Sequence, residues 1–150
     1  MSDLAPTCNG ILRADAKTSL PFEKASAGFA ILDPPYLRVA DGKRYENLGN
    51  EADEWIESLR AILTNLLPCL VSGGAVAIMC DDVLRKNEHT SVALLISQLI
   101  ADFNLAHRAT IYNHTPNFVF SMGPAQMKAA RQAKLLVNGC KIIQVAKIRR

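Results

Sequence analysis

The stretch at residues 29–36 constrains the fold most, because an apolar run there leads into an aspartate, two prolines and a tyrosine. The apolar part contains β-favouring residues and predicts a short buried strand. Pro34 and Pro35 fix φ and have no backbone N–H to donate, so the strand must end before them. We therefore expect a stiff, extended loop at the carboxyl end of a strand, which is the edge where open α/β sheets bind ligands.

Two side chains of this loop suit a planar ring that carries an exocyclic amine. Asp33 can accept a hydrogen bond from an amino group, and Tyr36 can offer a flat face for stacking. The alternative interpretation is a proline turn that only ends a strand.

The sequence Asp33-Pro34-Pro35-Tyr36 after an apolar strand resembles the catalytic motif of the amino-methyltransferases. That family uses S-adenosylmethionine (SAM) to methylate N6 of adenine or N4 of cytosine, mostly in DNA. The resemblance implies that the Asp33 carboxylate and the Pro34 carbonyl accept the two N–H groups of the target amine, while Tyr36 stacks on the base. Stacking worth about 1–3 kcal/mol offsets the few kcal/mol that flipping a base out of a duplex costs. No metal is required.

An acid upstream of the motif is a candidate for the cofactor site. Residues 11–16 predict a first strand that ends near Asp15, followed by a turn or short helix at residues 18–22. In similar methyltransferases the acid that ends this strand lies near the adenosine part of SAM, so the resemblance implies cofactor-binding roles for Asp15 and Asp33. The alternative for Asp15 is a turn acid at a strand end.

Hydrophobic periodicity predicts the remaining elements. We expect an amphipathic helix at residues 51–67 with Asn50 as its N-cap and Pro68 at its end, and a second helix at residues 92–103 capped by Thr90 or Ser91. The predicted connections and strands are a turn at residues 71–74, a buried strand at 75–80, a third central strand at 106–112, and a closing antiparallel pair at 134–137 and 141–147.

The acid pair Asp81-Asp82 follows the strand predicted at residues 75–80. Paired carboxylates can bind a metal or exchange protons, but no further residues with ligand spacing accompany them, which favours a strand-end turn. The four cysteines form no Cys-x-x-Cys pair. We predict no metal site.

Basic residues point to DNA as the partner. No Asp or Glu occurs from Phe103 to the last residue, so this segment is expected to form a surface that carries only positive charge. The candidate phosphate contacts are three residues of the loop after the motif and three of the terminal third, namely Arg38, Lys43, Arg44, Lys128, Arg131 and Lys134. The alternative is a solvated face that binds nothing specific.

A length of 150 residues predicts a single domain, here a methyltransferase-like catalytic domain over residues 1–150. The resemblance implies a three-layer, Rossmann-like α/β fold with a mostly parallel sheet. Hydrophobic residues make up 49% and charged residues 21%, which is ordinary for a soluble protein, and no apolar run is long enough to cross a bilayer. The scattered cysteines and the absence of a signal-like N-terminus indicate a cytoplasmic protein.

The family also carries a glycine-rich loop of the Phe-x-Gly-x-Gly kind that cradles the methionine end of SAM, and this sequence contains no such pattern. A second chain or a homo-oligomer is a candidate to complete the SAM site. Related enzymes with similar motifs modify guanine in ribosomal RNA or a protein glutamine amide, and Asp at the first motif position favours a base. Three alternatives therefore stay open, namely an enzyme acting on DNA, an rRNA base methyltransferase, and a degenerate nucleic-acid-binding module or subunit.

Overall fold

The computed structural model describes residues 2–3, 9–35, 37, 48–49, 51–85, 88–114 and 140–149. The elements in chain order are β1 (Ser2–Asp3), β2 (Leu12–Arg13), β3 (Ala27–Leu32), α1 (Ala52–Leu66), the 3-10 helix η1 (Leu67–Cys69), β4 (Leu70–Cys80), β5 (Val83–Arg85), β6 (Glu88–Thr90), α2 (Val92–Asp102), β7 (Ala106–His114) and β8 (Cys140–Lys147).

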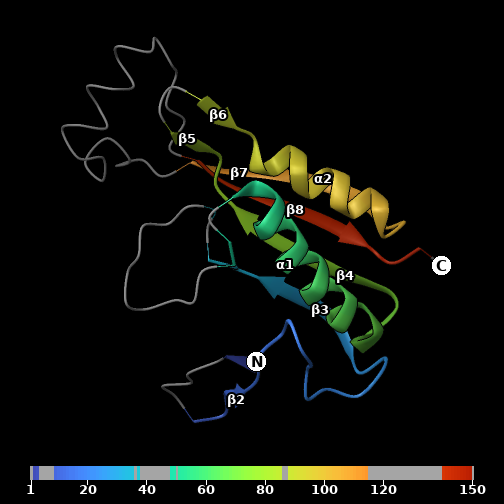
Figure 1. The fold of residues 1–150 in the computed structure, drawn as a ribbon. Coiled ribbons are helices and arrows are strands. Elements are labelled where there is room, and N and C mark those ends of the chain that lie inside the picture. Colours follow the sequence, from blue (N-terminus) through green and yellow to red (C-terminus); the bar gives the residue numbers. More distant parts are fainter. Residues whose placement is uncertain are drawn as a thin grey trace.

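A four-stranded sheet in the order β3-β4-β8-β7 forms the centre of the described structure (Figure 1). Strands β3 and β4 are parallel, whereas β8 is antiparallel to both of its neighbours, β4 and β7. The sheet is mixed, so the prediction of a mostly parallel sheet was wrong. The strand predicted as central, at residues 106–112, lies at an edge, because β8 is inserted between it and β4.

Both helices cover the same face of this sheet (Figure 1). Trp55 and Leu59 of α1 and Ile96 of α2 belong to one hydrophobic cluster with Ile78 of β4 and Ala146 of β8. The described residues therefore form two layers, and the predicted third layer is not among them. This arrangement leaves the other face of the sheet without a helix in the described part of the chain.

Helix α1 forms where the sequence predicts it. Its apolar residues recur every three or four positions and are buried, at Trp55, Leu59, Ile62, Leu63 and Leu66. The N-cap is Glu51 rather than the predicted Asn50, and its side chain makes no capping hydrogen bond. Pro68 lies in η1, since a proline is tolerated in the first turn of a helix but not in its interior.

Strand β4 begins earlier than predicted. Ala27 pairs with Leu70 and Phe29 pairs with Ala75, so β4 contains extra residues in this interval and bulges. Gly73 has a φ of +75°, and a Cβ on Gly74 would lie 2.9 Å from the carbonyl oxygen of Val71. The predicted turn at residues 71–74 is therefore this bulge inside a strand, which glycines permit.

The N-terminal prediction was right in part, since a turn follows Asp15 but the first strand is much shorter than expected. Only Leu12–Arg13 of the expected first strand is a strand, and it pairs in parallel with Ser2–Asp3 in a separate two-stranded sheet. A short hairpin of β5 and β6, which the sequence did not predict, lies between β4 and α2. The predicted closing strand is observed as β8, whereas its predicted hairpin partner at residues 134–137 lies outside the described residues.

Candidate active site at the carboxyl end of β3

The strand β3 ends at Leu32, and the chain then runs through Asp33, Pro34 and Pro35 as predicted. Asp33 is exposed, Pro34 is buried and Pro35 is half-buried. The Nε1 group of Trp55, a fully buried side chain of α1, donates a hydrogen bond of 2.8 Å to the carbonyl oxygen of Pro35. The loop is thus stiffened by its prolines and fixed to α1 by a buried indole.

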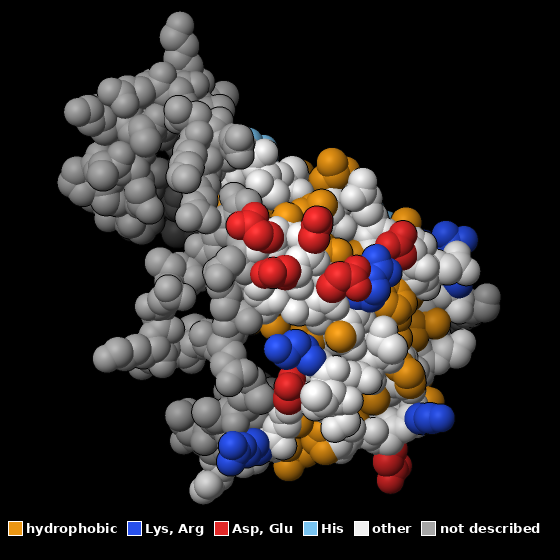
Figure 2. Space-filling view, viewed as in Figure 1, with side chains coloured by type: hydrophobic (Ala, Val, Ile, Leu, Met, Phe, Trp, Pro, Cys, Tyr) orange, Lys and Arg blue, Asp and Glu red, His pale blue; other side chains and the backbone are white. Residues whose placement is uncertain are grey.

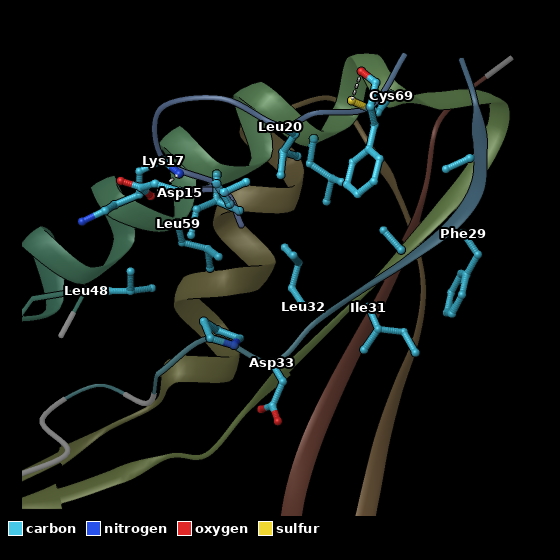
Figure 3. Close-up of a pocket in the computed structure, with 18 of the residues that line it drawn as sticks. Asp15, Lys17, Leu20, Phe29, Ile31, Leu32, Asp33, Leu48, Leu59 and Cys69 are labelled. Atoms are coloured by element: carbon cyan, nitrogen blue, oxygen red, sulfur yellow. Dashed lines mark hydrogen bonds between the residues drawn. The ribbon is translucent and has the colours of Figure 1, made fainter. Parts of the chain in front are cut away.

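A cavity of about 690 Å³ lies beside this loop. Its walls come from the segment at residues 14–22, from β3 with its loop, and from α1 with η1. In Figure 3, Leu20, Leu32 and Leu59 lie on the α1 side of β3, whereas Phe29 and Ile31 point to the other side of the strand. All five side chains line the cavity, which therefore extends around the edge of β3. Mostly apolar walls with a few polar groups are typical of a site for a small organic ligand.

Asp15 and Asp33, the two acids predicted for the cofactor site, both line this cavity. Asp15 also organises a turn, since its Oδ1 accepts from the backbone N–H of Lys17 at 2.9 Å and its carbonyl accepts from the backbone N–H groups of Thr18 and Ser19. Asp15 is therefore a turn acid, as the alternative interpretation held, and it also lines the cavity.

The segment carrying Asp15 is held against α1 by a residue that sequence reasoning missed. The Nδ2 group of Asn65 donates hydrogen bonds to the carbonyls of Ala16 at 3.0 Å and Lys17 at 2.9 Å. The only signal in the sequence was an amide in an otherwise apolar stretch of α1. Asn65 thus fixes one wall of the cavity.

Several predicted site residues lie outside the described part of the chain. These are Tyr36, Arg38, Lys43, Arg44, Lys128, Arg131 and Lys134. Their stacking and phosphate-binding roles stay predictions.

Asp82 caps the N-terminus of α2. This structural role fits the interpretation of the acid pair as part of a strand-end turn. Asp82 Oδ1 accepts from the backbone N–H of Ala93 at 3.2 Å, its carboxylate accepts from the Ser91 hydroxyl at 3.4 Å, and His89 Nε2 lies 3.4 Å away. Ser91 is the N-cap by position, but Asp82 supplies the capping acceptor. Within the described ranges, no three His, Cys, Asp or Glu residues gather as a metal site.

The buried thiol of Cys80 is held neutral. Burial, with smaller contributions from Asp82 and then Asp81, raises its pKa from about 9 to about 12. A thiol of this kind is unreactive at neutral pH, so Cys80 is a core residue rather than a nucleophile.

The helix-covered face carries acidic charge. Figure 2 shows several Asp and Glu side chains close together on it, and the first turn of α1 contributes Asp53 and Glu54. Figure 2 also shows Lys and Arg side chains on this face, so the face as a whole carries charges of both signs. Trp55, in the same turn of α1 as Asp53 and Glu54, donates to the Pro35 carbonyl, so these two acids lie close to the loop at the end of β3.

Comparison with known proteins identifies the fold. No protein-family model matches the chain, and no curated protein matches it in sequence. A provisionally assigned DNA modification methylase from Thermus thermophilus, TTHA0409, matches 91% of this chain and 52% of its own, at a TM-score of 0.66 and 17% identity. The cytosine-N4-specific PvuII DNA methyltransferase matches 85% of this chain and 43% of its own, at a TM-score of 0.61 and 14% identity.

A SAM-dependent methyltransferase from Methanosarcina mazei matches 97% of this chain and 73% of its own, at a TM-score of 0.51 and 10% identity. The chain therefore has the α/β fold of SAM methyltransferases and is structurally similar to DNA modification methylases over about nine-tenths of its length. It spans about half the length of those two methylases. None of the described helices is long and apolar enough to cross a membrane.

Proposed function

We propose that this chain provides the catalytic loop of a SAM-dependent methyltransferase that acts on N6 of adenine or N4 of cytosine in DNA. The observation that carries the proposal is the Asp33-Pro34-Pro35 loop, which lies at the end of β3, is held by Trp55, and lines a cavity of about 690 Å³. The likeness to SAM methyltransferase structures, one of them TTHA0409 in complex with SAM, supports the choice of cofactor.

The residues around the cavity fit SAM. The leucines offer apolar contact to an adenine ring, and the carboxylates of Asp15 and Asp33 suit hydroxyl groups and a positively charged sulfonium. When bound, SAM supplies the methyl group. We assign Asp15 and Asp33 to holding it, with no metal involved.

The loop would act by positioning the target amine. An exocyclic amine is a poor nucleophile because its lone pair delocalises into the ring. Hydrogen bonds to the Asp33 carboxylate and the Pro34 carbonyl would hold both N–H groups and turn the lone pair towards the methyl group. An in-line approach with reacting atoms roughly 3–3.5 Å apart would then give most of the rate increase. Stacking of the base on Tyr36 is part of the same proposal.

The test is methyl transfer from isotope-labelled SAM to DNA, followed by digestion to nucleosides. The protein is purified from its own cells, so that any partner it holds stays bound. The proposal expects label in N6-methyladenine or N4-methylcytosine, with weaker transfer at higher salt, since phosphate contacts release counterions. Label in ribosomal RNA alone would favour the rRNA alternative, and salt-sensitive DNA binding without any transfer would favour a binding module.

A further inference from the structure

Four side chains of α1 and η1 form a row of hydrogen-bond donors along the cavity wall, namely Trp55, Ser58, Asn65 and Cys69. Their spacing of three, seven and four residues places them on one side of the helix. Each donates to a backbone carbonyl of a residue that lines the cavity, and these acceptors are Pro35, Leu48, Ala16 with Lys17, and Phe22. Asn65 is the donor whose acceptors follow an acid directly in the chain.

Asn65 is connected to the Asp15 carboxylate through a single peptide group. Its Nδ2 group donates to the carbonyl oxygen of Ala16 at 3.0 Å. The N–H of the same peptide group, which belongs to Lys17, donates to Asp15 Oδ1 at 2.9 Å (Figure 3). A peptide group is planar and trans, so its C=O and N–H point in opposite directions. Holding the carbonyl of Ala16 therefore fixes where the N–H of Lys17 points, and with it the position of the carboxylate.

The next peptide group repeats this connection. Asn65 Nδ2 also donates to the carbonyl of Lys17 at 2.9 Å. The N–H on the other side of that peptide group belongs to Thr18 and donates to the backbone carbonyl of Asp15 at 3.0 Å. Two successive peptide groups are thus held by Asn65 at one end and by Asp15 at the other, and hydrogen bonds linked in this way strengthen one another.

The arrangement leaves one oxygen of the Asp15 carboxylate for a ligand. The N–H of Lys17 occupies Oδ1, whereas Oδ2 has no hydrogen-bond partner among the described residues. Asp15 lines the cavity, and the described lining residues do not include Asn65. Because hydrogen bonds weaken steeply when they are misaligned, the orientation of this carboxylate decides how well it accepts from a ligand.

We propose that Asn65 is a positioning residue for ligand binding, which holds the Asp15 carboxylate where it accepts a hydrogen bond from the adenosine part of SAM. The proposal rests on the proposed function. Trp55 of the same row holds the loop that carries Asp33, so the two side chains position different parts of the site. Loss of the Asn65 amide should therefore weaken the binding of SAM and leave the methyl-transfer step unchanged.

The test measures the dissociation constant of SAM by titration calorimetry, on protein purified from its own cells with any bound partner. Asn65→Leu is close in size, favours a helix and removes the donor, and Asn65→Asp is an isosteric second variant that cannot donate to the carbonyls. The matched control is Thr64→Leu at the neighbouring position, whose hydroxyl donates to the Arg60 carbonyl within α1. Each variant is also combined with Asp15→Ala. Circular dichroism checks the fold, and hydrogen exchange without SAM reports on the N–H groups of residues 17–19.

We expect SAM to bind about tenfold more weakly to both Asn65 variants, which corresponds to about 1.4 kcal/mol, and normally to Thr64→Leu. In the Asp15→Ala background the Asn65 variants should cause no further loss, because residues that act through one contact are not additive. Exchange at residues 17–19 should be faster without the amide. In methyl transfer, KM for SAM should rise while kcat at saturating SAM stays unchanged.

An unchanged dissociation constant in folded Asn65 variants, an equal loss with and without the Asp15 carboxylate, unchanged exchange at residues 17–19, or a lower kcat would overturn the proposal. A wild type that shows the expected binding but transfers no methyl group would contradict only the proposed function. A wild type that binds no SAM would contradict both.

Discussion

At the scale of single residues, Trp55 links the core to the candidate active site. Its ring is fully buried, and its Nε1 group is the hydrogen-bond donor for the Pro35 carbonyl. A core residue of this kind sets the position of the loop as well as the stability of the fold. These two effects are separable by substitution.

Trp55→Phe keeps an aromatic ring but leaves the Pro35 carbonyl without this donor. We expect the free energy of unfolding to fall by about 1–3 kcal/mol and kcat/KM for methyl transfer to fall as well, because the loop is less well positioned. Urea denaturation and kinetics measure the two effects. The control is Leu63→Ala, another fully buried site on α1, which should lose about 2–5 kcal/mol of stability with kcat/KM of the folded protein unchanged.

Cys80 gives a prediction on pH. Its thiol ionises near pH 9 in the unfolded chain but only at about 12 in the folded protein, so the unfolded state releases a proton first. Stability from this group is therefore complete below pH 9 and declines as pH rises towards 12. The wild type should be the more stable protein at neutral pH. The difference between its urea midpoint and that of Cys80→Ala should become smaller when the pH is raised from about 7 to about 10.5. An equal difference between the two urea midpoints at both pH values would contradict a pKa of Cys80 that is raised by burial.

At the scale of elements, the bulge at the start of β4 depends on Gly74. A Cβ there would lie 2.9 Å from the Val71 carbonyl oxygen and 3.2 Å from that of Gly28, so backbone would have to shift. Gly74→Ala should destabilise the protein by about 1–3 kcal/mol in thermal or urea unfolding. At Gly28 a Cβ meets nothing within 4 Å, so Gly28→Ala should be neutral or slightly stabilising. Equal effects of the two substitutions would argue against this bulge geometry.

The sequence predicts those elements whose apolar period is long and regular. Helices α1 and α2 and strand β8 lie where periodicity puts them, because burial of one face decides their formation. Strand β3 also lies where its apolar run predicts a strand, but in the described structure it is an edge strand with no buried residue, so the prediction of a buried strand was wrong. The antiparallel direction of β8 was expected, but its insertion between β4 and β7 was not predicted, because pairing between distant strands leaves no signal in the local sequence. The capping of α2 by Asp82 was missed because it joins residues that are distant along the chain.

The candidate site was likewise predictable from the sequence only in part. Asp33 and its prolines were identified from local sequence, because a strand that stops at proline is a local event. The cavity beside them was not predictable, as it depends on how the segment with Asp15 is hydrogen-bonded to Asn65. The stacking and phosphate-binding residues fall outside the described part of the chain and stay predictions.

At the scale of the whole molecule, the described structure is open on one side. One sheet face is covered by α1 and α2, whereas the other face has no helix among the described residues and adjoins the edge strand β3. The active-site loop lies at the end of that edge strand.

The most direct test of the central claim compares methyl transfer by the wild type, Asp33→Ala and Asp53→Ala, each purified with any bound partner. Asp33 is exposed at the loop, and Asp53 is a matched exposed acid in the first turn of α1. The account predicts that Asp33→Ala keeps its fold and loses at least about 100-fold in kcat/KM, the size of effect seen when one positioned hydrogen-bonding group is removed, while Asp53→Ala transfers methyl groups normally. Undiminished transfer by folded Asp33→Ala would contradict the assignment of this loop as catalytic.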